Sequence, residues 1–380
     1  MDTKSHLVIP RYLAQGSRIC LGFLVVLQAK QSGELIPVGR VINVSVIYSM
    51  LAVSSLLPFM PTIWKQFKPR SVIRWIIGFQ IVLLAIPFSL IQSRPDKILL
   101  LWFFFVFVLA TLLLQYACEL NRENEKWVTL IQIITNFCTI GAILSGFDLI
   151  IAYFIPYQFF LVLAFFLIGP FSSEGIKLDA RRFASLAKKF LGFSILLSLA
   201  WPVAFYFLRE NYANKSPKNW EDLEFTIRIG MSVLGLVSAV ILNYKFYDGV
   251  VKIEDIKKRA VKNASISFFL LGLGFLLCLH FNSVLPVGKM FLILAAFGIK
   301  IITLFYSYLL IKTGFIKFIL AMELTHCLAI VAGTFVNFDL AGILFFNSVV
   351  SFLVIIRKCK KVLSSPMEGI LSGDVPEVVR

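Results

Sequence analysis

The sequence predicts an all-α polytopic membrane protein with about twelve transmembrane helices in two six-helix lobes. Three observations predict it. Hydrophobic residues make up 59% of the 380 residues and charged residues only 15%, a balance that the core of a soluble domain cannot bury. The apolar residues fall into stretches of about 20, the length of helix that crosses a bilayer. Basic residues gather in every second gap between these stretches.

The expected spans follow the chain from end to end. They run over residues 12 to 29, 35 to 63, 73 to 92, 98 to 118, 127 to 147, 149 to 171, 190 to 208, 225 to 244, 264 to 285, 290 to 311, 315 to 336 and 339 to 356. The fifth and sixth are separated only by residues 145 to 148. If this segment is a kink rather than a turn, the number of spans changes by one.

The basic residues predict the orientation of these spans, because Lys and Arg near a span resist translocation. With the N-terminus inside, the inner segments hold 25 Lys and Arg and the outer segments hold 8. Both termini are therefore expected in the cytoplasm and the protein in the cell (inner) membrane. The net charge of +16 is spread over short loops, which argues against nucleic acid as a partner and favours anionic membrane lipids.

The two halves begin alike. The stretch RYLAQGSRICLGFLVVLQ from Arg11 aligns with RRFASLAKKFLGFSILLS from Arg181, and six spans follow each start. We expect an N-terminal lobe over residues 1–173, a C-terminal lobe over 190–361 and a cytoplasmic tail over 362–380. Residues 174–189 are basic but keep apolar side chains on one helical face, which predicts an amphipathic linker at the membrane surface. The alternative is an ordinary basic loop.

The sequence gives no sign of a metal site, a cofactor site or an enzyme active site. Its six cysteines form no CxxC pair, and its three histidines are scattered. The longest outer loop, 209 to 224, is too short to fold as a catalytic domain. We therefore expect no enzyme, no metal and no cofactor.

Ionisable residues inside spans are costly in hydrocarbon and are the first candidates for function. Arg18, Arg40, Arg228 and Lys300 are the expected substrate-binding residues. Lys300 lies about ten residues from either end of its span and cannot easily extend to water. For the others, Arg18 and Arg40 could reach an interface, and Arg228 could pair with Glu224 four residues earlier.

Two further residues, Glu323 and His326, lie one helical turn apart in the eleventh span and are candidates for coupling or gating. The intramembrane cations have no evident matching carboxylates, and the first six spans offer only Glu119 and Asp148, both at predicted ends. This pattern favours an anionic cargo, and a lipid diphosphate linked to sugars is one.

The two repeat starts, together with NFDLAGILFFNSVVSFLVIIRK from Asn337 to Lys358, resemble the polysaccharide and O-antigen flippases of the multidrug, oligosaccharidyl-lipid and polysaccharide exporter superfamily. The resemblance implies two six-helix lobes around a cationic cleft. It also implies alternating access that moves an undecaprenyl-diphosphate-linked oligosaccharide from the inner to the outer leaflet for surface polysaccharide biosynthesis. H+ or Na+ is the candidate coupling ion.

Three other functions stay open. A membrane enzyme of the same pathway, such as a polymerase or acyltransferase, would be favoured by a conserved outer-facing His, Arg or carboxylate pair in homologues. A multidrug exporter of the same fold would be favoured by a buried, titrating carboxylate. A ligand-sensing receptor fits poorly with two halves of six spans.

Overall fold

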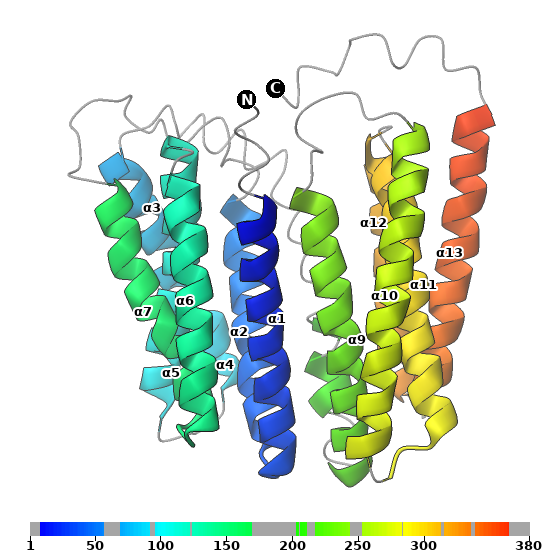
Figure 1. The fold of residues 1–380 in the computed structure, drawn as a ribbon, viewed down its shortest axis with the longest axis horizontal. Helices are drawn as coiled ribbons and strands as arrows, with labels where there is room; N and C mark the ends of the chain where they lie inside the picture. The colour runs from blue at the N-terminus through cyan, green and yellow to red at the C-terminus, as the bar shows by residue number, and fades with distance from the viewer. Residues whose placement is uncertain are drawn as a thin grey trace. The chain divides into compact units, whose positions relative to one another are not determined.

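A computed structural model describes residues 8–56, 69–91, 96–121, 124–168, 203–204, 206–210, 217–243, 253–282, 284–312, 315–335 and 339–364. Within these residues all regular structure is helical. Seven helical stretches are long and apolar enough to cross a membrane: Val72–Leu90, Lys97–Cys118, Asn124–Leu144, Leu149–Ile168, Ala264–Phe281, Val287–Ser307 and Leu340–Val362. The protein is therefore an all-α membrane protein (Figure 1).

The chain divides into two compact units, Met1–Tyr206 and Phe207–Arg380. The helices of the first unit are α1 (Val8–Gln31), α2 (Leu35–Leu56), α3 (Pro69–Leu83), α4 (Ala85–Leu90), α5 (Lys97–Leu120), α6 (Asn124–Leu144) and α7 (Leu149–Ile168). Helix α5 packs extensively against α7, and α1 against α6. Helix α5 also contacts α2, α3 and α6, so it forms the centre of this unit.

Aromatic side chains fill the contact between α5 and α7. Phe103, Phe104 and Phe107 of α5 surround Phe154 of α7, with ring centroids 5.6 to 6.0 Å apart. Tyr157, one turn further along α7, stands edge-on to Phe107 at 4.4 Å. Buried aromatic pairs of this kind add stability beyond the apolar area that they bury.

Two glycines end helices in this unit. Gly33 (φ 74°) follows α1 and Gly146 (φ 84°) follows α6, a left-handed backbone that glycine adopts without a steric penalty. After each glycine, the next residue's N–H donates back to the last turn: Glu34 to Ala29 O at 2.8 Å and Phe147 to Ala142 O at 3.1 Å. This is the Schellman ending of a helix. The segment 145 to 148 is therefore a turn between two helices and not a kink.

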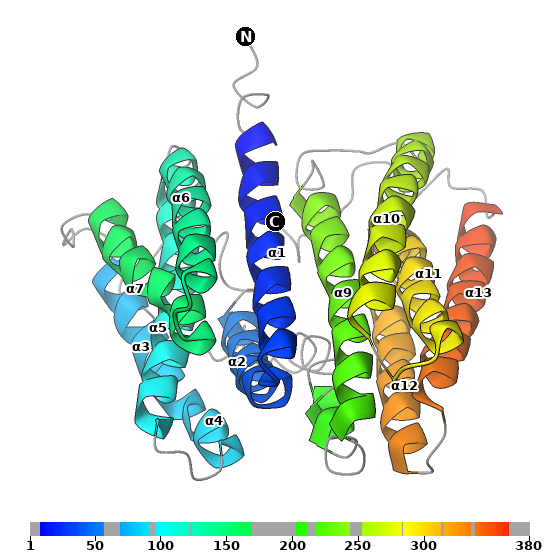
Figure 2. The ribbon, with the colours of Figure 1, turned by 60° about the horizontal axis from the view of Figure 1, so that its bottom comes forward.

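The second unit contains α9 (Pro217–Asn243), α10 (Ile253–Phe281), α11 (Val287–Lys312), α12 (Ile316–Phe335) and α13 (Leu340–Ser364). These long helices lie side by side (Figures 1 and 2). Helix α11 contacts all four of the others and packs most extensively on α13. Residues that α11 carries at mid-length are thus surrounded by protein.

Contacts at the helix ends of the second unit join segments that the sequence predicts on one side of the membrane. Asp222, before the expected eighth span, contacts the backbone of Val284 and Leu285 at the end of the ninth. Lys289 pairs with Asp339 at 2.8 Å. These contacts join three segments, before the eighth, tenth and twelfth expected spans, and all three are expected outside, as up-and-down helices require.

Within the described residues, the expected spans and the observed helices agree closely in position. Each expected span overlaps a described helix, although 190 to 208 is described only at 203–204 and 206–208. One difference is internal: the expected span 73 to 92 is interrupted at Leu84, between α3 and α4. The linker 174–189 and residues 365–380 of the tail lie outside the described residues, and the number twelve stays a prediction.

Candidate functional site

An ion pair lies inside the second unit, between α11 and α12. Lys300 Nζ of α11 lies 2.6 Å from Glu323 Oε2 of α12, and the two side chains are only 10% and 18% exposed. Removing two charges from water costs several kcal/mol per ion, and their attraction repays this only with good geometry. Such a pair is therefore weak evidence for stability and better evidence for a role in function.

His326 extends this pair to a third helix. It follows Glu323 by three residues and is buried, and its Nδ1 lies 3.4 Å from Ser351 Oγ of α13. Which of the two groups donates depends on the histidine tautomer. Lys300, Glu323, His326 and Ser351 thus form what we call the α11–α13 polar cluster.

Helical spacing explains why these residues share one interior face. Lys300, Thr303 and Ser307 recur at intervals of three and four along α11, and all three are buried. On α13, Ser348 and Ser351 are one turn apart and buried. A polar stripe therefore runs along the packed faces of helices that are apolar elsewhere, where polar residues are kept away from lipid.

A second charged cluster lies where α9 begins. Glu224 Oε1 accepts from Arg209 Nη2 at 2.9 Å and from Arg228 Nε at 3.0 Å. Arg209 is fully buried and Arg228 nearly so. Since one carboxylate oxygen meets two guanidinium groups, the three residues together carry a formal charge of +1. We call them the Glu224 cluster.

The residues beside the Glu224 cluster connect it to the turn after α10. Asp222 Oδ2 accepts from the N–H groups of Val284 and Leu285 at 2.6 and 3.0 Å. Asn282 Nδ2 donates to Thr226 Oγ1 at 2.9 Å. These bonds join the first turns of α9 to α10 and α11, so the arginines sit on a rigid part of the unit.

One premise of the sequence interpretation is wrong. The cations Lys300 and Arg228 do have carboxylate partners, Glu323 and Glu224. The alternative pairing of Arg228 with Glu224 is confirmed. The pattern along one helix shows a pair four residues apart, such as Arg228 with Glu224, but it does not show a pair between two helices, such as Lys300 with Glu323.

The remaining expected site residues lie in the first unit. Arg40 is on α2 and half-buried. Arg18 is on α1, and its side chain lies outside the described part of the structure. The substrate-binding roles of all four cations stay predictions.

The sequence also left some members of these clusters unrecognised. Arg209 was assigned to an outer loop, yet its side chain is fully buried. The sequence does not single out Ser351 of the α11–α13 polar cluster, or Thr303 and Ser307 next to Lys300 on α11, because single hydroxyl residues are common in membrane helices. Their spacing on one face with Lys300 was the signal that could have found two of them.

The described residues include no group of three His, Cys, Asp or Glu side chains that could hold a metal ion. No protein-family model matches the chain, and no curated protein matches it.

Proposed function

We propose that this protein is a membrane transporter that flips an undecaprenyl-diphosphate-linked oligosaccharide from the inner to the outer leaflet by alternating access. The observation that carries the proposal is Lys300, a cation buried midway along an apolar helix and held against one carboxylate. An anionic headgroup that crosses a membrane needs such fixed positive charge in place of its water.

The ion pair adds a step to this proposal. A diphosphate reaches Lys300 only by displacing Glu323, so cargo binding and release become an exchange of partners at one ammonium group. With the pair closed, the charge of Lys300 is neutralised within the protein. With the cargo bound, Glu323 needs another partner, and a proton or Na+ could provide it. His326, one turn away, would be the nearest titratable neighbour on the same helix.

The two compact units support the same proposal in a different way. Each unit has its own packed core. In the first unit α5 packs most extensively against α7, and in the second α11 packs most extensively against α13. Alternating access requires bodies that keep their internal packing while they move. The 25 to 8 division of basic residues gives the orientation in which such a transporter would work.

Reconstitution tests the proposed function. Purified protein in liposomes should move a fluorescent undecaprenyl-diphosphate oligosaccharide to the leaflet where an added membrane-impermeant glycosidase can cleave it. Cleavage should exceed half of the total only in vesicles that contain the protein. Equal cleavage with and without protein, at verified incorporation, would contradict flipping.

A multidrug exporter is the second candidate, and the buried carboxylates favour it. Glu323 and Glu224 supply the negative charges that a cationic drug would need. Expression in a drug-sensitive strain separates the two functions. Resistance to lipophilic cations that is lost in Glu323→Gln, without any flipping in liposomes, would favour export.

A further inference from the structure

The outward face of α13 ends in positive charge. Phe346, Val350, Leu353 and Val354 are exposed, while Ser351, Ile355 and Cys359 on the opposite side are buried. In a membrane helix the exposed apolar side chains contact lipid. This side of α13 is therefore its lipid-facing side.

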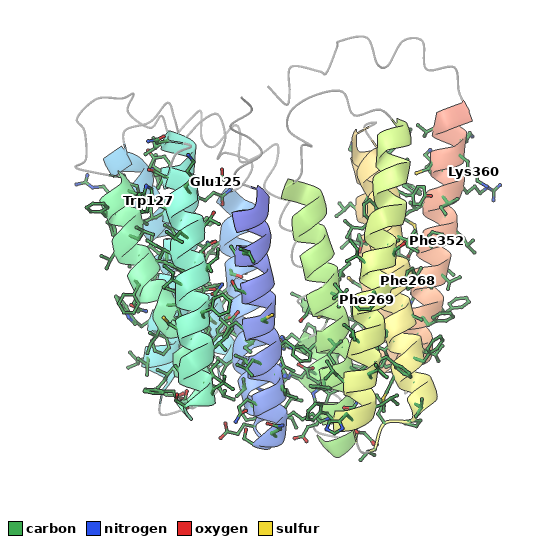
Figure 3. All side chains as sticks on the ribbon, in the orientation of Figure 1. Glu125, Trp127, Phe268, Phe269, Phe352 and Lys360 are labelled. Atoms are coloured by element: carbon green, nitrogen blue, oxygen red, sulfur yellow. The ribbon has the colours of Figure 1, made fainter. Side chains whose placement is uncertain are left out.

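The same face continues into three cations. Arg357, Lys360 and Lys361 follow Leu353 and Val354 at intervals of three, four, six, seven and eight residues and are exposed. At about 100° per residue, all five positions fall within an arc of about 120°. Figure 3 shows Lys360 projecting outward from the end of α13. Helix α13 contains no Asp or Glu, so no carboxylate of this helix offsets the charge.

This end of α13 is held in place by its neighbours. Lys358 points to the start of α12, where its Nζ lies 4.4 Å from the centre of the Phe315 ring and 5.8 Å from that of Phe318. Cys359 Sγ donates to Tyr306 O of α11 at 3.5 Å. The three exposed cations therefore lie on a helix end that contacts with α11 and the start of α12 hold in position. Lys317, exposed in the first turn of α12, adds a further cation at the same end.

We propose that this face is a binding site for an anionic phospholipid. The acyl chains lie along Phe346, Val350 and Leu353, and the headgroup phosphate meets Arg357, Lys360 and Lys361. An apolar strip that passes directly into cations matches the two parts of such a lipid in order. A soluble acidic partner would use the cations alone and leave the apolar strip unexplained. The proposal is independent of the transported cargo.

Competition binding tests the proposal on the full-length protein in detergent micelles. The probe is fluorescent phosphatidylglycerol, and the competitors are unlabelled phosphatidylglycerol, phosphatidylcholine and inorganic phosphate. Arg357→Gln/Lys360→Gln should bind the probe about twenty-five-fold more weakly, since each surface cation contributes about fivefold. Arg357→Lys/Lys360→Arg, which keeps both charges, should bind as the unchanged protein does.

The matched control is Arg74→Gln/Lys126→Gln, which removes one exposed Arg and one exposed Lys from α3 and α6. It should bind phosphatidylglycerol within about twofold of the unchanged protein, because the proposed site lies on α13. Equal weakening in the two double variants would overturn the site in favour of the overall charge. Competition by inorganic phosphate as strong as by phosphatidylglycerol would overturn the lipid as ligand.

Discussion

At the scale of single residues, Lys300 illustrates how a partner on another helix changes the meaning of a buried charge. By sequence it is an isolated cation in a span, and in the structure it is half of an ion pair with Glu323. An isolated cation is always available to bind an anion, whereas a paired cation binds one only after its carboxylate partner has been displaced. Under the proposed function, the pair would therefore make Lys300 a site of exchange.

Lys300→Ala should lower both stability and transport. It leaves Glu323 as a buried carboxylate without its ammonium partner, which typically costs about 3–5 kcal/mol. Transport should fall by about tenfold or more, and Lys300→Arg should retain more of it because it keeps the positive charge. Thermal unfolding in detergent and surface-glycan production in a flippase-deficient strain give the two readouts.

The matched control for Lys300→Ala is Lys289→Ala, on the same helix. Lys289 pairs with Asp339, but both side chains are more than two-fifths exposed. Exposed pairs contribute about 1 kcal/mol at most. Full glycan production by Lys300→Ala at normal membrane abundance would show that this lysine does not meet the cargo.

Glu224→Gln should destabilise the second unit more than any other single carboxylate change near it. Glu224 is the carboxylate that pairs with both Arg209 and Arg228, and both arginines are largely buried. The substitution removes its negative charge from both ion pairs. We expect a loss of about 3 kcal/mol, measured by thermal unfolding. Glu221→Gln, the same change one turn earlier on α9 at a half-buried position, should cost under about 0.5 kcal/mol. Equal unfolding temperatures of the two variants would contradict the role given to Glu224.

The two clusters also show which residues and contacts of a site can be predicted from the sequence. Sequence reasoning found Lys300, Glu323, His326 and the Arg228–Glu224 pair, because all five follow from depth within a span or from four-residue spacing. It missed the Lys300–Glu323 bond and the Arg209–Glu224 bond. These join residues 23 and 15 apart, and which helix faces which is decided by packing.

At the scale of elements, glycines set how closely the helices of the second unit approach. A Cβ added to Gly230 of α9 would overlap the Phe297 ring of α11, and one added to Gly333 of α12 would overlap Ile343 of α13. Small residues allow such close approach in membranes, where the hydrophobic effect does not drive helices together. The position of α11, and of Lys300 with it, depends on these contacts.

Gly230→Ala should therefore destabilise the unit by about 1–3 kcal/mol through overpacking against Phe297. Gly272→Ala is the matched control, because a Cβ at Gly272 of α10 meets nothing within 4 Å. It should be neutral or stabilising by up to about 1 kcal/mol, since alanine favours helix. Thermal unfolding in one detergent compares them, and a Gly230→Ala protein as stable as Gly272→Ala would refute the close packing.

Helix positions were largely predictable at this scale, and helix contacts were not. Runs of apolar residues about one bilayer long predict where helices lie, because the bilayer imposes their length. The apolar pattern does not predict the break at Leu84, although Pro87, which has no N–H to donate to the carbonyl of Leu83, marks it. The turn at Gly146 was recognisable from its Ser-Gly-Phe-Asp composition, which the sequence interpretation left open between turn and kink.

At the scale of the whole molecule, the alternation of helices makes a prediction about sidedness. In a protein freed of its native cysteines, Ser32→Cys and Val284→Cys should react with a membrane-impermeant maleimide in intact cells. Lys360→Cys should react only after lysis. All three positions are exposed in the structure. Labelling in the opposite pattern would reverse the orientation on which the direction of the proposed flipping depends.

The central claim is that Lys300 exchanges Glu323 for the diphosphate of the cargo. Affinity for an undecaprenyl-diphosphate oligosaccharide, measured on purified Glu323→Gln and Lys300→Gln proteins, tests it most directly. The account predicts opposite signs: Glu323→Gln removes the competing carboxylate and should bind about tenfold more tightly, while Lys300→Gln should bind about tenfold or more weakly. Weakening in both variants would mean that the pair only holds α11 and α12 together, and would contradict the claim.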